Sequence, residues 1–160
     1  MTISDAAPFN WPPRADIRGQ GGADPAVLLG AENAVDFAIG SAVSPAEAMD
    51  RAVAMTALAL PRLLDKAHVP ADACSSVEAV VTELVDVTAR HQASADLVAR
   101  LAYDGAHFTV SVGDMARALP APEEEPGLYL VHRVAAEVGQ YAGDHGGRVT
   151  WAAVPARLEN

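Results

Sequence analysis

The segment ACSSVEAVVTELVDVTARH, residues 73–91, is followed after a short gap by LVARLAYDGAHFTVSV, residues 97–112. In the first segment, side chains that suit one buried helix face recur three or four positions apart: Val77, Val80, Val81, Leu84 and Thr88. The second segment alternates on both sides of Asp104-Gly105, a dipeptide typical of tight hairpin turns. The two segments therefore predict a long helix followed by two antiparallel strands.

The residues before this segment predict one more strand and one more helix. Ala34 to Val43 has the pattern of a strand, and Ser44-Pro45-Ala46-Glu47 is a capping box with proline at the first helical position. The helix should run to about Lys66, with a kink or a break at Pro61, because proline removes an interior hydrogen bond. Its apolar positions include Met49, Val53, Leu58 and Leu60.

The residues after it predict a loop, a third helix and a last hairpin. Met115 to Pro126 is rich in proline and ends in Glu123-Glu124-Glu125, so we expect a loop. The third helix then has Leu128, Val131, Ala135 and Val138 on one face and ends at Gly139. Tyr141 and the stretch 149–153 suggest strands joined around residues 144–147. The order β-α-α-β-β-α-β-β predicts an α+β fold: a two-layer sandwich with helices on one face of a mixed, mostly antiparallel sheet.

With 160 residues, about half of them apolar, the chain is long enough for one domain with a substantial core. We place this domain at residues 35–156, with a partly flexible N-terminal extension at 1–34 and a short tail at 157–160. The extension contains proline and glycine clusters and no sustained period. Its aromatic residues, Phe9 and Trp11, could dock on a partner or fold back on their own domain, and we favour folding back.

The net charge of −10 limits the classes of partner. It should repel nucleic acid and anionic membranes, whose binding depends on clustered lysine and arginine, so a protein partner or a neutral ligand is expected. No apolar run reaches the roughly 18 residues of a membrane span, and a cytoplasmic location is expected. We interpret the single cysteine, Cys74, as a small buried thiol. His91, His132 and His145 lie in different predicted elements, so we expect surface or cap residues and no metal site.

Four short motifs follow one another along the domain: VTELVDVTARH at 81–91, VSVGDMA at 110–116, EPGLYLV at 125–131 and GGRVTW at 146–151. In this order and spacing they resemble the GHKL (histidine-kinase-like) ATPase superfamily. The resemblance spans about residues 35–156 and is closest to small actinobacterial ATP-binding regulators related to anti-sigma-factor serine kinases.

The resemblance implies roles for individual residues. The first motif is similar to E-L-V-x-N-A-x-x-H, which puts Glu83 at the position of the catalytic base and Val87 at that of a metal-binding asparagine. The second is similar to a strand ending in D-x-G or D-x-S, so Asp114 would accept a hydrogen bond from the adenine amino group, although Ala116 departs from that pattern. The third is similar to G-x-G-L-x-L-V, which wraps the phosphates. Gly127 and Leu128 match it, and Glu125 replaces its first glycine.

The departures weaken the expected nucleotide site. Glu83 and Val87 share a helix face, but the valine has no oxygen to offer Mg²⁺. The acidic residues 123–125 precede a helix N-terminus, which they can cap while repelling a triphosphate. Asp114 could instead be a turn or capping residue, and Glu83 a solvated or hydrogen-bonded helix residue.

We therefore expect a regulatory protein-binding module resembling anti-sigma factors and their kinases, with a role in signalling or transcription regulation and with weak or absent ATP binding. Its partner would be a sigma factor, an anti-anti-sigma-like protein or another regulator, and it could form a homodimer. No cofactor is expected. One alternative is an active protein-serine kinase that uses ATP with Mg²⁺, with Glu83 as base, Asp114 on adenine and Gly127 at the phosphates. Another is a non-catalytic structural subunit of a dimer or larger complex.

Overall fold

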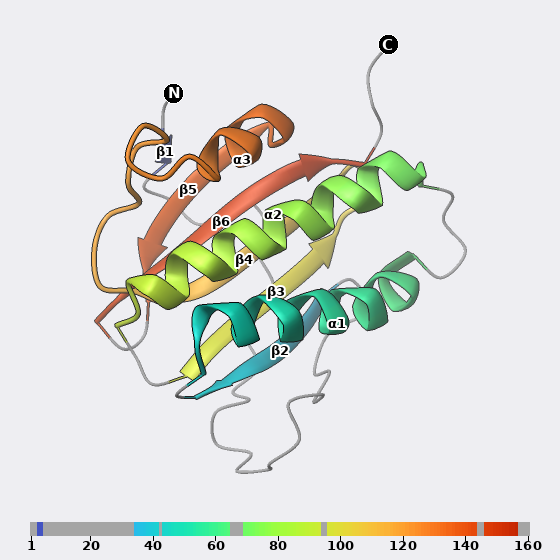
Figure 1. The fold of residues 1–160 in the computed structure, drawn as a ribbon. Coiled ribbons are helices and arrows are strands. Elements are labelled where there is room, and N and C mark those ends of the chain that lie inside the picture. Colours follow the sequence, from blue (N-terminus) through green and yellow to red (C-terminus); the bar gives the residue numbers. More distant parts are fainter. Residues whose placement is uncertain are drawn as a thin grey trace.

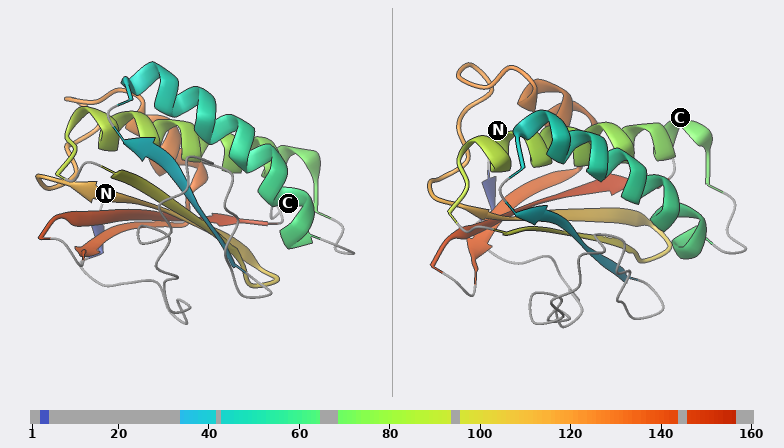
Figure 2. Two further views of the ribbon diagram at one scale, coloured as in Figure 1. Left: turned by 90° about the horizontal axis from the view of Figure 1, so that it is seen from below. Right: turned by 60° about the horizontal axis from the view of Figure 1, so that its bottom comes forward.

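The computed structural model describes residues 3–4, 34–41, 43–64, 69–93, 96–143 and 146–156. They form a six-stranded sheet in the order β1-β5-β6-β4-β3-β2, with helices α1, α2 and α3 on one face (Figures 1 and 2). β1 (Ile3–Ser4) runs parallel to β5 (Glu137–Ala142), and the other neighbouring strands are antiparallel. The sheet is thus mixed and mostly antiparallel, and the predicted two-layer α+β sandwich is confirmed. β1 comes from the stretch that we assigned to the N-terminal extension.

The predicted helix and hairpin in the middle of the chain are both present. α2 spans Ala71–Arg90, and β3 (Asp96–Tyr103) pairs with β4 (His107–Met115) in antiparallel register. The turn between the strands forms because Asp104 Oδ1 accepts the backbone N–H groups of Ala106 and His107 at 2.8 and 2.7 Å. Gly105 takes a φ of +93°, which residues with a side chain rarely adopt.

The capping box predicted at Ser44 opens α1 (Pro45–Leu64), since Glu47 N donates to Ser44 Oγ at 3.2 Å. Of the kink or break expected at Pro61, the break does not occur, because α1 continues as one helix through this residue. Pro61 is exposed and lies in the last turn of the described helix. The carbonyl that loses its partner there belongs to the exposed Ala57, on the solvent side, where water can satisfy it. The expected end at Lys66 lies outside the described residues.

The third helix is shorter than its pattern predicted. α3 spans only Leu128–Val134, and Val138 and Gly139, which we had assigned to it, belong to β5. There Val138 pairs with Ala152 of β6 (Arg148–Pro155). Gly139 permits this pairing because a Cβ at that position would meet the Trp151 ring at 2.6 Å. Strand pairing and close packing therefore override the helical spacing. β5 and β6 form the expected last hairpin, although residues 144 and 145 of its turn are not among those described.

The hydrophobic core lies between the helices and the sheet. Alternate residues of β2 (Ala34–Ser41), β3, β4 and β6 point towards α1 and α2, whose own buried stripes complete the core. Its central members from the strands are Phe37, Ile39, Leu97, Leu101, Phe108, Val110, Val112 and Val154. Among the residues described, no helix is long and apolar enough to cross a bilayer.

The opposite face of the sheet holds a buried ion pair. Asp36 on β2 lies directly across from Arg100 on β3, and the two side chains are only 2% and 1% exposed. Arg100 donates from Nε to Asp36 Oδ1 at 2.6 Å and from Nη2 to Oδ2 at 3.0 Å. Because an unpaired buried charge is costly, the pair fixes the register of β2 against β3.

Candidate functional site

One face of α2 and the loop that follows β4 enclose a cavity of about 160 Å³. We call residues 116–127, which join β4 to α3, the lid. The helix contributes side chains three or four positions apart, so they share a face, while its apolar stripe packs on the core. The cavity is lined by Glu83, Asp86, Val87, Arg90, Glu125, Pro126, Gly127 and Leu128. This volume is below the roughly 300 Å³ at which small-molecule sites usually begin.

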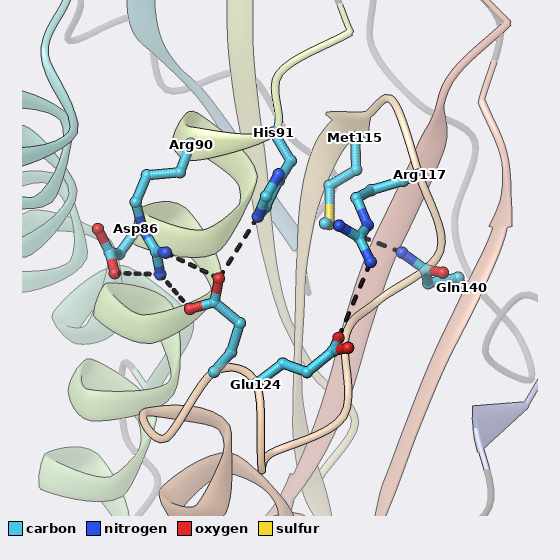
Figure 3. A network of polar contacts seen from close by, with 8 residues as sticks. Asp86, Arg90, His91, Met115, Arg117, Glu124 and Gln140 are labelled. Carbon is cyan, nitrogen blue, oxygen red and sulfur yellow. Dashed lines mark hydrogen bonds and ion pairs between the residues drawn. The ribbon is translucent and has the colours of Figure 1, made fainter.

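The start of the lid is fixed by a buried amide. Gln140 of β5 accepts the backbone N–H of Leu119 at 2.9 Å and donates to Thr150 Oγ1 at 2.9 Å. Its amide nitrogen also lies 3.6 Å from Met115 Sδ, at the end of β4 (Figure 3). The lid therefore leaves the sheet at a defined place, because releasing Gln140 would leave buried polar groups without partners.

The far end of the lid contacts α2 through Glu125. Arg90 donates to both carboxylate oxygens of Glu125, at 2.8 and 2.6 Å, and to Asp86 Oδ2 at 2.9 Å (Figure 3). His91 Nε2 lies 3.4 Å from the same carboxylate. Arg90 lowers the pKa of Glu125 against the opposing effect of burial, and hydrogen bonds to Glu125 and Asp86 raise the pKa of Arg90. The carboxylate is thus held in its charged form.

This contact corrects the expected role of the acidic residues at the lid end. We expected their side chains to cap the third helix, but no side-chain hydrogen bond caps α3, whose N-cap residue is Gly127. Glu125 joins the start of α3 only through its carbonyl, which accepts the Leu128 N–H at 2.9 Å. Its side chain turns to α2 instead. Glu123 and Glu124 are exposed, as the alternative of a solvated acidic loop predicted for all three.

Glu83 lies directly against the backbone of Gly127. A Cβ built on Gly127 would overlap the Glu83 carboxylate, so with any other residue at this position the Glu83 side chain would have to move. Burial raises the pKa of Glu83, the neighbouring Asp86 raises it further, and Arg90 opposes both. The two residues that the sequence assigned to a base and a phosphate loop are therefore in contact, with Leu128 lining the same cavity.

Val87 offers this cavity an apolar wall. The valine is 1% exposed and belongs to the hydrophobic core, where the resemblance implied a metal-binding asparagine. Mg²⁺ needs oxygen ligands, which an isopropyl group cannot supply. Within the described residues, no group of three or more His, Cys, Asp and Glu side chains is placed to hold a metal ion.

Asp114 lies apart from the cavity at the end of β4. Its side chain is 1% exposed and packs against two glycines of the β5–β6 turn. A Cβ at Gly143 would come within 2.8 Å of Asp114 Oδ1, and one at Gly147 within 2.5 Å of its Cβ. Its carbonyl accepts the Ala93 N–H at 3.0 Å and so ties the α2–β3 connection to the end of β4. Of the four residues proposed to bind nucleotide, the structure brings together Glu83, Gly127 and Leu128, and Asp114 is not among those that line the cavity.

The remaining predicted side chains take ordinary structural positions. His91 is the C-cap residue of α2, as expected, and its backbone N–H donates to Thr88 O. His132 lies on α3 with its pKa lowered, chiefly by burial, and His145 is outside the described residues. Cys74 is half-buried, less than expected, because it lies near the start of α2; burial and then Glu78 raise the pKa of its thiol.

Arg90, the cation of the cavity, was not among the residues that the sequence motifs indicated. One signal was available, since Asp86 and Arg90 are four positions apart and of opposite charge. Nothing local indicated that Glu125, 35 positions further along the chain, would complete the pair.

No protein-family model and no curated protein sequence matches this chain.

Proposed function

We propose that this protein is a cytoplasmic regulatory module with a GHKL-like ATPase fold that binds a protein partner and has weak or absent affinity for ATP. The order of the elements supports the family resemblance. So does the meeting of Glu83, Gly127 and Leu128 around one cavity, although they lie far apart in the sequence. By this resemblance, the partner is a sigma factor, an anti-anti-sigma-like protein or another regulator of transcription.

The observation that carries the weak nucleotide binding is the charge and shape of the cavity. Three carboxylates line it against a single cation, Arg90, and Val87 supplies no metal ligand. A triphosphate carries several negative charges and needs cations or free N–H donors around it. Here the guanidinium is already paired with Glu125, and Glu83 fills the space beside Gly127. The cavity therefore disfavours phosphates on both electrostatic and steric grounds.

The outer face of α1 supports the protein-binding part of the proposal. Val53 and Leu58 are 44% and 54% exposed, although both were counted among the apolar positions of this helix. The exposed Ala54, Ala57 and Pro61 lie on the same outer side. Apolar side chains gathered on one helix face are common in surfaces that bind another protein, including a second copy of the same chain.

Calorimetric titration tests the first half of the proposal. ATP and ADP are titrated into the full chain with and without Mg²⁺, and we expect no binding at micromolar concentrations. Mg²⁺-dependent binding in that range would contradict the proposal. For the second half, a protein that copurifies from the native host is purified and titrated separately. We expect the two proteins to form a direct complex. Leu58→Asp should weaken this complex, whereas Arg133→Asp, a change at an exposed site on α3, should retain it.

A second function, an ATP-dependent protein-serine kinase, is favoured by one observation. The raised pKa of Glu83 and its place in the cavity suit a residue that accepts a proton from a serine hydroxyl. Transfer of phosphate from ATP to the copurified protein, abolished by Glu83→Gln, would support the kinase. Binding of that protein without any transfer supports the non-catalytic module.

A further inference from the structure

The contact between Arg90 and Glu125 joins α2 to the lid, and the C-cap residue His91 adds a longer contact of 3.4 Å to the same carboxylate. Arg90 belongs to the last turn of α2, and Glu125 lies near the end of the lid. Both carboxylate oxygens accept hydrogen bonds from the guanidinium, and this two-bond geometry is the strongest form of the arginine–carboxylate interaction. Asp86 holds the guanidinium from the other side and so orients it towards the lid.

The neighbouring parts of the lid are held in other ways. Leu119 is bonded to Gln140, and Leu128 is buried in the core, so both ends of the lid are anchored to the domain. Glu124 is exposed and pairs only at 3.8 Å with Arg117, another lid residue. The segment between the two anchors is held by its own turns, by the packing of the buried Pro120 and Pro122, and by the contacts of Glu125 with the end of α2.

We propose that the Arg90–Glu125 pair is a lock that holds the lid against α2 beside the cavity at Glu83. While the pair is intact, the lid carboxylate occupies the only guanidinium in the cavity wall. Arg90 is 39% exposed, so the lock lies at the surface and can open by a movement of the lid without unfolding α2. The proposal depends only on these contacts and holds or fails whether or not the protein is a regulator.

Residue-resolved amide exchange measures how firmly the turns of the lid are held when the lock is present and when it is lost. The backbone N–H groups of Glu124 and of residue 125 bond to Ala121 O, and those of Leu128 and Tyr129 bond to the carbonyls of residues 125 and 126. In the full-length Glu125→Gln variant, we expect these amides to exchange about fivefold faster, the effect of losing one partly exposed ion pair. The Leu119 amide, held by Gln140, should keep its rate.

Glu124→Gln is the matched control, because it removes the same charge from the next residue and leaves the lock intact. We expect its lid amides to change less than twofold. In a double-mutant cycle with Arg90→Gln, adding Glu125→Gln should produce little further acceleration, since only the 3.4 Å contact with His91 is left to lose. Equal exchange in the Glu124→Gln and Glu125→Gln variants would overturn the lock. So would additive effects in the cycle, or an equal acceleration of Leu119 and the strand amides, which would indicate general destabilisation.

Discussion

Replacing Arg100 by methionine should destabilise the fold more than any surface substitution. Asp36 is 2% exposed in the native protein, and the change removes the hydrogen bonds of 2.6 and 3.0 Å that its carboxylate accepts from Arg100. Breaking one side of a buried ion pair costs about 3–5 kcal/mol, a large part of the roughly 5–15 kcal/mol that stabilises a typical domain. Urea denaturation of the full chain at neutral pH, followed by circular dichroism, measures the loss.

Two further variants make this reasoning refutable. The exposed Arg133 on α3 is the matched control, and its replacement by methionine should change the free energy of unfolding by less than about 0.5 kcal/mol. The double variant Asp36→Leu with Arg100→Met removes both charges, so it should cost less than Arg100→Met alone. A loss below about 1 kcal/mol for Arg100→Met, or a double variant less stable than the single one, would show that the buried pair does not stabilise β2 against β3.

Three other predictions concern the cavity. Glu125→Gly should raise the affinity for ADP more than Val87→Asn, because it removes a carboxylate from the cavity and one of the two ion pairs of Arg90; the reverse order in calorimetry would point to the metal position alone. In Gly127→Ala the new Cβ displaces the Glu83 carboxylate, the end of a flexible side chain, so the free energy of unfolding should fall by about 1 kcal/mol or less, and Glu83→Ala should recover that loss in thermal unfolding; a loss that Glu83→Ala does not recover would refute the clash with Glu83. Arg90 lowers the pKa of Glu125, so the stabilisation of the closed lid by this pair is complete above the ordinary glutamate range and is lost as the pH falls through the lowered pKa. The protection of the lid amides, corrected for the slower intrinsic exchange in acid, should therefore fall over this range in the native protein and show no such step in Glu125→Gln.

Local patterns predicted the elements whose partners lie close in the sequence. The capping box at Ser44 and the Asp104 turn depend on hydrogen bonds across two or three residues, and both form as expected. The helical spacing through Val138 misled because the competing interaction is distant: Ala152, its partner on β6, lies far along the chain. The same holds for the opposite face of the sheet, where alternation along β3 did not reveal that Arg100 would be buried against Asp36.

The candidate site was predictable only as a set of residues. The motifs located Glu83 and Gly127, and the fold brings the two into contact. They did not indicate how Glu125 is used. The sequence predicted that an acidic residue in place of glycine at position 125 would repel phosphate. In the structure, Glu125 is also the partner of a cation, Arg90. That second role requires the tertiary approach of the lid to Arg90, which no local periodicity encodes.

The two departures from the motif therefore reinforce each other. Valine at position 87 supplies no metal ligand to offset the carboxylates of Glu83 and Asp86, and among the described residues that line the cavity Arg90 is the one positive charge. Glu125 then satisfies that charge from within the chain, which stabilises the closed lid and leaves no cation for a phosphate. Restoring an oxygen ligand at 87 while the lid stays closed would add a polar group to a wall that is 1% exposed and packed in the core. Opening the lid without a metal ligand would free only one guanidinium for a highly charged ligand. Each change is of limited use without the other, so their effects on Mg²⁺-nucleotide affinity should be larger in combination than the sum of the two alone.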